Sequence, residues 1–250
     1  MTNNSYVLNS KLTGENARRS DVYQDWEQDN QAWWDWYVTL AENNDEKINI
    51  SQNYALPVVP GLNKERILEE LSDPYILDVQ QVNQFKRDGF IKLKNFLSPG
   101  SIIFLRTILK KLLNKTFSNK KNKKKRSFLS LDMTWISNNF IRSYVLSPRI
   151  AGVAGQLLEV EKIRLYHDNV LSKEPGCGRT PWHYDAHHFP LATNNVVTAW
   201  IPAQPIPKIM GPLAFAKPIS TYKLVSNLLF DKFNISYDKA VSECFKKNNV

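Results

Sequence analysis

Residues 162–173, KIRLYHDNVLSK, alternate between two sets of side chains with a period of two. Successive side chains of a β-strand point to opposite faces of a sheet, so this alternation predicts a strand. NVVTAWIPA (195–203) and GPLAFA (211–216) also have strand character, and proline-rich turns separate them. The second half of the chain is therefore predicted to be rich in β-structure.

A short amphipathic helix is predicted upstream, over residues 79–88. Gly89 is expected to end this helix, and a strand is expected to start at Phe90. The side chains predicted to face inward are Val79, Val82 and Phe85.

Two longer helices are predicted to start at serine–proline pairs, Ser98–Pro99 and Ser147–Pro148. In each pair the serine is a capping residue, and the proline stands at the first helical position. An apolar stripe of helical period follows both pairs. Helices followed by strands predict an α+β fold, a sheet sandwich or jelly roll braced by N-terminal helices.

The chain is predicted to have one domain, residues 79–250, preceded by a tryptophan-rich arm, residues 1–78. Trp26, Trp33 and Tyr37 recur at near-helical spacing, so one face of a helix in the arm is expected to pack on the main body. Hydrophobic residues make up 42% of the chain, which excludes a disordered protein.

The net charge of +9 is concentrated in one stretch. Nine basic residues and no acidic ones fall between residues 110 and 126. The run NKKNKKKR (119–126) contains no aromatic residue that stacks on bases, so we favour a solvated loop over a nucleic-acid contact.

The polar start of the chain, MTNNSYVLNSK, lacks the apolar segment of a signal peptide, and no apolar run approaches the length of a membrane span. Cys177 and Cys244 fall in no CxxC spacing, which fits a reducing compartment. These features predict a cytoplasmic protein without a membrane partner.

The tripeptide HYD (183–185) is the candidate metal site. Residues i and i+2 of an extended strand project to the same face, so His183 and Asp185 can reach one ion together. They would be two members of a 2-His-1-carboxylate triad, which leaves open positions on Fe(II). Alone, the tripeptide also fits a surface turn.

The blocks around this tripeptide resemble the phytanoyl-CoA dioxygenase family of iron- and 2-oxoglutarate-dependent oxygenases. An upstream segment resembles the family's N-terminal opening, so the resemblance spans roughly residues 80–216. The matching blocks are VNQFKRDGFIKLKNFLSP (82–99), KEPG (173–176), TPWHYDAHHFP (180–190), VVTAWIP (196–202) and GPLAF (211–215). The resemblance implies a double-stranded β-helix, a cupin-like jelly roll, that holds Fe(II) through His183 and Asp185.

The resemblance also implies the reaction. Dioxygen oxidatively decarboxylates 2-oxoglutarate to succinate and CO2 while an unactivated carbon of a small organic substrate is hydroxylated. No catalytic side chain beyond the metal ligands is implied. The carboxylate of Asp185 argues against the family's halogenases, in which a small residue takes this place.

Further positions carry over one at a time. Trp200, Asn169 and Thr198 match positions that contact 2-oxoglutarate, although Trp200 equally fits a core aromatic residue and Thr198 an inward strand threonine. His187 and His188 are candidates for the substrate pocket, with exposed loop histidines as the alternative.

Two expected residues are missing from the sequence. The family takes its third metal ligand, a histidine, and an arginine for 2-oxoglutarate from strands well downstream, but no histidine follows His188 and no arginine follows Arg179. We therefore expect that the chain ends before its last strands and that residues 1–250 turn over weakly or not at all. The alternative is a truncated or degenerate, non-catalytic member. Substrate and oligomeric state are not specified by the sequence.

Overall fold

A computed structural model of the chain describes residues 63–117, 128–175, 180–185, 191–228 and 236–250. The tryptophans predicted to form a helix in the arm lie outside these ranges, as do Cys177, His187 and His188. The described elements, in chain order, are α4 (Lys64–Ser72), α5 (Val79–Asp88), α6 (Pro99–Phe117), β1 (Phe128–Asp132), α7 (Thr134–Ser137), α8 (Asn139–Val145), α9 (Pro148–Leu158), β2 (Asn169–Lys173), η2 (Lys208–Met210), η3 (Ile219–Thr221), α10 (Tyr222–Val225) and α11 (Ser236–Lys247).

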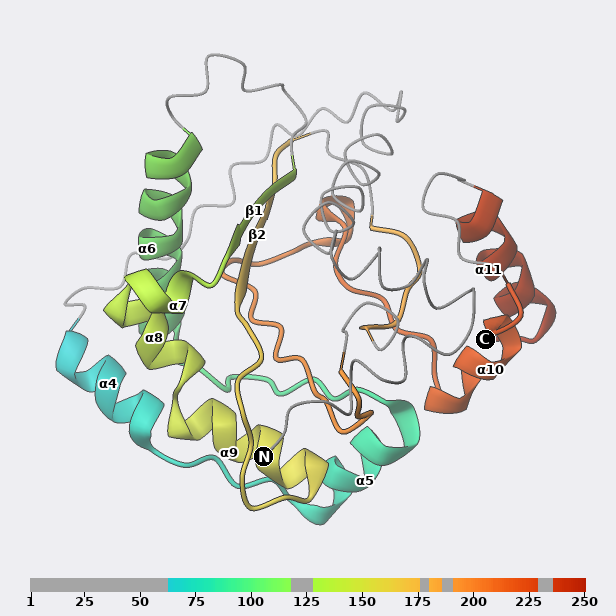
Figure 1. The fold of residues 1–250 in the computed structure, drawn as a ribbon, viewed down its shortest axis with the longest axis horizontal. Coiled ribbons are helices and arrows are strands. Elements are labelled where there is room, and N and C mark those ends of the chain that lie inside the picture. The colour runs from blue at the N-terminus through green and yellow to red at the C-terminus, as the bar shows by residue number, and fades with distance from the viewer. Residues whose placement is uncertain (1–62, 118–127, 176–179, 186–190, 229–235) are drawn as a thin grey trace, which may run out of the picture.

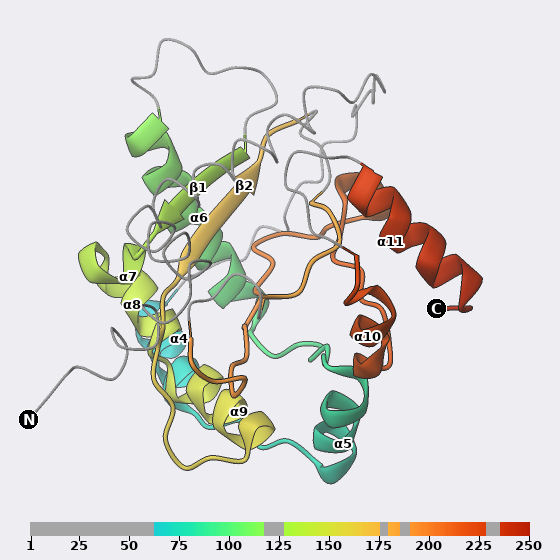
Figure 2. The same cartoon turned by 45° about the vertical axis from the view of Figure 1, so that its right-hand side comes forward.

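Most helices lie in two groups on opposite sides of the molecule, and α5, which contacts α9 and η3, lies between them (Figure 1). Helices α4, α8 and α9 pack together, and α6 contacts α8. Helices α10 and α11 lie at the opposite side, and the turned view in Figure 2 agrees. Long connecting segments run between these two groups, so residues 191–220 cross the middle of the fold.

Both serine–proline helix starts are confirmed. Helix α6 begins at Pro99 and helix α9 at Pro148, as local capping chemistry predicts. The Ser147 hydroxyl accepts the backbone N–H of Ile150 at 3.3 Å and donates to the carbonyl of Leu71 at 2.6 Å. This serine therefore caps α9 and ties it to the end of α4.

Helix α5 is also confirmed, together with its end at Gly89. Gly89 adopts a left-handed φ of 80°, and a Cβ atom added there would lie 2.9 Å from Ile219 Cγ1. Val82 and Phe85 pack against the cluster around Val153. Val79 does not face inward: it is 75% exposed, because it is the first residue of the helix and points away from α9.

The predicted strands are mostly wrong. Within 162–173 only Asn169–Lys173 forms a strand. The segments expected to start at Phe90 and to cover 195–203 and 211–216 are described, and none of them is a strand. A strand requires a neighbour that completes its hydrogen-bond ladder, and an alternating pattern does not supply one. Instead, side-chain contacts hold these segments, as where the Phe90 and Phe215 rings stack at 4.3 Å.

The sheet formed by the described residues has two antiparallel strands, β1 and β2, paired from Phe128↔Lys173 to Asp132↔Asn169. Strand β1 was not predicted. The fold is thus α+β, as expected, whereas the jelly roll stays a prediction.

One extended segment is held by a side-chain amide. Gln156 of α9 accepts the backbone N–H of Leu77 through Oε1 at 2.8 Å and donates through Nε2 to the carbonyl of Tyr75 at 2.8 Å. The segment before α5 is therefore fixed to α9 by a donor and an acceptor on one side chain.

The main core cluster joins α4 to the helices that follow. Its fully buried members are Ile67, Leu71, Leu97, Leu105 and Tyr144. Ile67 and Leu71 belong to the predicted arm, residues 1–78, so the arm and the predicted domain share this core. The domain boundary itself stays a prediction. No helix in the described ranges is long and apolar enough to cross a membrane.

Candidate metal centre

His183 and Asp185 lie side by side within the described segment 180–185. His183 Nε2 is 3.7 Å from Asp185 Oδ1, and the two side chains are 30% and 45% exposed. Residues 180–184 form neither a helix nor a strand, so the two side chains come together without the predicted strand.

The other ring nitrogen of His183 is fixed by the backbone. Nδ1 lies 2.8 Å from the carbonyl of Pro181. A carbonyl oxygen only accepts hydrogen bonds, so Nδ1 carries the proton and donates it. In the neutral ring the lone pair is then on Nε2, the atom that faces Asp185. Metal-binding histidines are commonly oriented in this way.

The carboxylate of Asp185 is fixed as well. The Thr198 hydroxyl donates to Asp185 Oδ2 at 2.8 Å, which leaves Oδ1 directed toward His183. The predicted contact of Thr198 with 2-oxoglutarate stays a prediction, and the structure shows instead that this hydroxyl donates to the carboxylate of Asp185. Sequence reasoning placed Thr198 near the site without identifying this partner.

The pair fits a metal ion. Imidazole nitrogen and carboxylate oxygen bind a divalent metal at about 2.1 Å, so one ion spans donor atoms up to about 4 Å apart. Within the described ranges, no group of three or more histidine, cysteine, aspartate or glutamate side chains is placed to hold an ion. Of the described residues, His183 and Asp185 could therefore hold an ion as two of the three donors that a facial triad needs.

Asn169 lies apart from this pair, at the start of β2. Its amide nitrogen donates to Asp132 Oδ1 at 2.6 Å, and its amide oxygen accepts the Ser130 hydroxyl at 3.1 Å. Both functional atoms of Asn169 thus contact β1. The amide keeps a second N–H and a second oxygen lone pair beyond these two bonds, and its predicted contact with 2-oxoglutarate stays a prediction.

Asp132, His167 and Asp168 form a cluster at the end of the sheet where Asp132 pairs with Asn169. Burial raises the pKa of Asp132; His167 lowers it and the Asp168 carboxylate raises it further. Asp168 is held by the Thr134 hydroxyl and by the backbone N–H of Trp135. The cluster braces the turn between β1 and α7.

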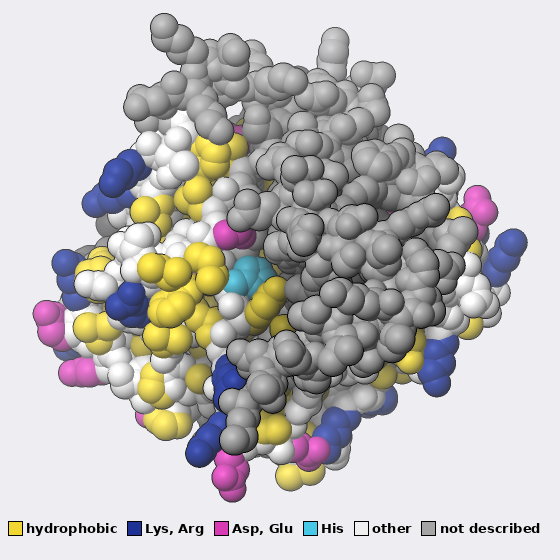
Figure 3. Space-filling view, viewed as in Figure 1, with side chains coloured by type: hydrophobic (Ala, Val, Ile, Leu, Met, Phe, Trp, Pro, Cys, Tyr) yellow, Lys and Arg dark blue, Asp and Glu magenta, His cyan; other side chains and the backbone are white. Residues whose placement is uncertain are grey.

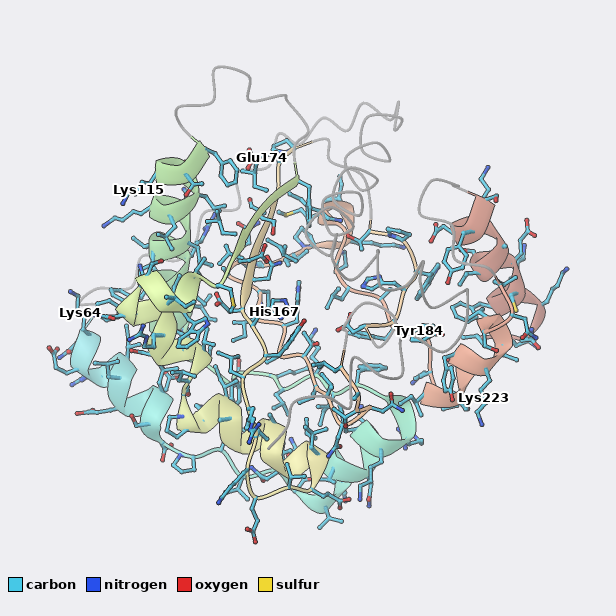
Figure 4. The ribbon with its side chains drawn as sticks, viewed as in Figure 1. Lys64, Lys115, His167, Glu174, Tyr184 and Lys223 are labelled. Atoms are coloured by element: carbon cyan, nitrogen blue, oxygen red, sulfur yellow. The ribbon has the colours of Figure 1, made fainter. Side chains whose placement is uncertain are left out.

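His167 lies in an apolar part of the surface. On the face drawn in Figure 3, hydrophobic side chains gather beside a histidine. Figure 4, drawn in the same view, labels His167 at this place. Leu165, Tyr166 and Leu171, its neighbours in sequence, are 37%, 41% and 49% exposed. Trp200 is also 48% exposed. Its predicted place in the co-substrate pocket stays a prediction.

The residues on both sides of His183 contact the C-terminal helices, which sequence reasoning missed. Trp182 bonds to Asp238 and Ser242 of α11, and the Tyr184 ring lies 6.0 Å from that of Tyr222 in α10. Figure 4 shows Tyr184 on the side of α10 and α11. These contacts join residues about 40 to 60 positions apart, and no local sequence pattern predicts them.

The paired imidazole and carboxylate, with their outer hydrogen bonds, are of the residue types that a non-haem iron centre uses. A family model described as phytanoyl-CoA dioxygenase matches residues 85–217, just over half of the chain. The chain therefore belongs to the phytanoyl-CoA dioxygenase family, within the Fe(II)- and 2-oxoglutarate-dependent oxygenase superfamily. Comparison with curated proteins and with solved structures gave no match.

Proposed function

We propose that the protein is a dioxygenase that binds Fe(II) and 2-oxoglutarate and hydroxylates an unactivated carbon of a small organic substrate, with release of succinate and CO2. The observation that carries the proposal is the His183–Asp185 pair, with Nε2 and Oδ1 3.7 Å apart. This pair lies inside the region matched by the family model.

In this proposal His183 and Asp185 bind the metal, and their neighbours hold them in place. The Pro181 carbonyl keeps the Nε2 lone pair of His183 available, and the Thr198 hydroxyl keeps one oxygen of Asp185 turned toward the same point. Bound Fe(II) would supply the redox chemistry with dioxygen. Trp200 is proposed to line the 2-oxoglutarate pocket, and the small-molecule substrate is proposed to bind near His187 and His188.

A metal titration tests the proposal. Co(II), which substitutes for Fe(II) without oxidation in air, is titrated into the full chain, and binding is followed by calorimetry and visible absorption. We expect one site that is lost in His183→Ala and in Asp185→Ala. Glu159→Gln, which alters an exposed carboxylate in a different part of the fold, should bind as the wild type does. Equal binding by wild type and His183→Ala would contradict the proposal.

The alternative is a member that keeps the fold without turnover. It is favoured by the finding that the described residues bring only two protein donors together. Two donors hold Fe(II) less firmly than a complete triad, so we expect weak succinate formation by residues 1–250. Succinate at ordinary enzyme rates would contradict that expectation.

The coding sequence beyond residue 250 separates the two functions. A continuation that carries a histidine and then an arginine favours the oxygenase, since these are the residue types that the family uses to complete the iron site and to bind 2-oxoglutarate. A stop without such a continuation favours the non-catalytic member.

A further inference from the structure

Helix α11 presents one face to Trp182, the residue directly before His183. The carboxylate of Asp238 accepts the backbone N–H of Trp182 at 2.9 Å, and the Ser242 hydroxyl accepts its indole N–H at 3.2 Å. The Phe245 ring meets the indole edge-on, with centroids 5.2 Å apart. Residues spaced by four and three lie on one side of a helix. One helical face therefore holds Trp182 at its backbone, its indole nitrogen and its ring.

The groups of α11 that contact Trp182 are themselves held in place by neighbouring residues. Asp238 is only 6% exposed, and a buried carboxylate is retained where it accepts hydrogen bonds. The Ser242 hydroxyl donates to the carbonyl of Asp238 at 2.8 Å, so its oxygen lone pairs are turned toward the indole N–H. Val241, which is 1% exposed, fixes α11 in the same cluster.

The residue after His183 contacts the same helical unit. Tyr184 lies against Tyr222 of α10, and burial raises the pKa of Tyr184, with Tyr222 adding to the rise. The backbone on both sides of His183 is thus seated on α10 and α11. His183 itself contacts Asp185.

We propose that Asp238 is a positioning residue for the metal-binding pair: by holding the backbone N–H of Trp182, it fixes the direction in which His183 presents Nε2 to the metal. This inference rests on the proposed function, because it assumes that His183 and Asp185 bind the ion. Helices α10 and α11 lie outside the region 85–217 matched by the family model. The contact between Asp238 and Trp182 is therefore seen in the structure of this chain and does not follow from the family match.

The test is Co(II) binding to the full chain, measured as affinity and as the visible absorption spectrum of the bound ion. Asp238→Ala should weaken binding roughly tenfold, as the loss of an outer hydrogen-bond partner does at other metal sites, and should alter the spectrum. Asp238→Asn keeps an acceptor oxygen and should restore most of the affinity. Ser242→Ala, which removes only the indole contact, should give a smaller loss in the same direction.

Val241→Ala is the matched control. It weakens the packing of α11 but keeps both hydrogen bonds to Trp182, so thermal unfolding should shift while Co(II) affinity changes less than twofold. The inference is overturned if Asp238→Ala binds Co(II) as the wild type does, or if Val241→Ala loses as much affinity as Asp238→Ala. If Asp238→Ala does not fold, Ser242→Ala and Asp238→Asn decide.

Amide hydrogen exchange separates a failure of this inference from a failure of the proposed function. The Trp182 amide should exchange faster in Asp238→Ala than in the wild type, whether or not metal is present. If the wild type does not bind Co(II) through His183 and Asp185, both proposals fall. If it does, and affinity is indifferent to Asp238, only the positioning role falls.

Discussion

Replacing Tyr144 by phenylalanine tests the link between α8 and α6. Tyr144 is 2% exposed, and its hydroxyl donates to the carbonyl of Ser101, itself fully buried, at 2.6 Å. Phenylalanine keeps the ring and removes this bond. A buried hydrogen bond contributes about 1 kcal/mol to stability, so Tyr144→Phe should lower the free energy of unfolding by that amount at neutral pH.

The same residue gives the variant a pH signature. Burial raises the pKa of Tyr144 to about 12, whereas the unfolded chain has the ordinary value of 10.0. Below pH 10 the hydroxyl is protonated in both states, and its contribution to stability is complete. As pH rises from 10 toward 12, the unfolded state loses this proton first, so the stability of the wild type falls.

The size of this loss follows from the difference between the two pKa values. Two units correspond to an upper limit of about 2.7 kcal/mol, and relaxation of the surroundings with water entry around the ionised hydroxyl reduces this to about 1 kcal/mol. The advantage of the wild type over Tyr144→Phe should therefore shrink to near zero at high pH.

Urea unfolding of both proteins at about pH 7.5 and about pH 11.5 measures this difference. Ile141→Val, a 3% exposed position on the same helix, removes a methylene without a titrating group and should cost about 1 kcal/mol at both pH values. A cost of Tyr144→Phe that is the same at both pH values would refute the reasoning, because the hydroxyl would then not be buried as the structure shows.

Three further substitutions probe the site and its frame. Thr198→Val keeps the branched shape but removes the hydroxyl that orients Asp185, so Co(II) binding should weaken by about 1 kcal/mol, roughly fivefold, in calorimetry, whereas Thr198→Ser should bind normally. Ser147→Ala should lower the free energy of unfolding by about 1–2 kcal/mol in urea, because α9 loses its cap and its tie to α4; an unchanged midpoint would contradict this. Gly89→Ala should lower thermal stability by about 1 kcal/mol through its left-handed φ, with a further cost from the close Ile219 side chain. Ile219→Ala removes Cγ1 and Cδ1 but leaves a Cβ 3.1 Å away, so it should recover only part of that further cost.

The helices were predictable because their signals are local. A serine cap followed by proline acts within one turn, and Gly89 ends α5 through its own backbone freedom. The proximity of His183 and Asp185 was predictable for the same reason, because they are only two positions apart in the sequence. These features need no knowledge of the rest of the fold.

The strands and the supports of the site were not predictable in this way. The alternation in 195–203 marks an extended segment but says nothing about a partner, and β1 has a pattern too short to detect. Trp182 and Asp238 are joined across 56 positions, and Thr198 reaches Asp185 across 13. Such contacts depend on how the segments pack.

Gln156 shows how extended backbone stays ordered with little sheet around it. Its amide accepts the N–H of Leu77 and donates to the carbonyl of Tyr75, as a peptide group of a neighbouring strand would, and Nε2 also donates to the carbonyl of Gly152 at 3.0 Å. A helix side chain here imitates a piece of backbone. Glutamate in place of Gln156 would keep the shape of the side chain. It would, however, place an acceptor oxygen where Nε2 now donates to the Tyr75 carbonyl, so even this conservative exchange would separate the segment from α9.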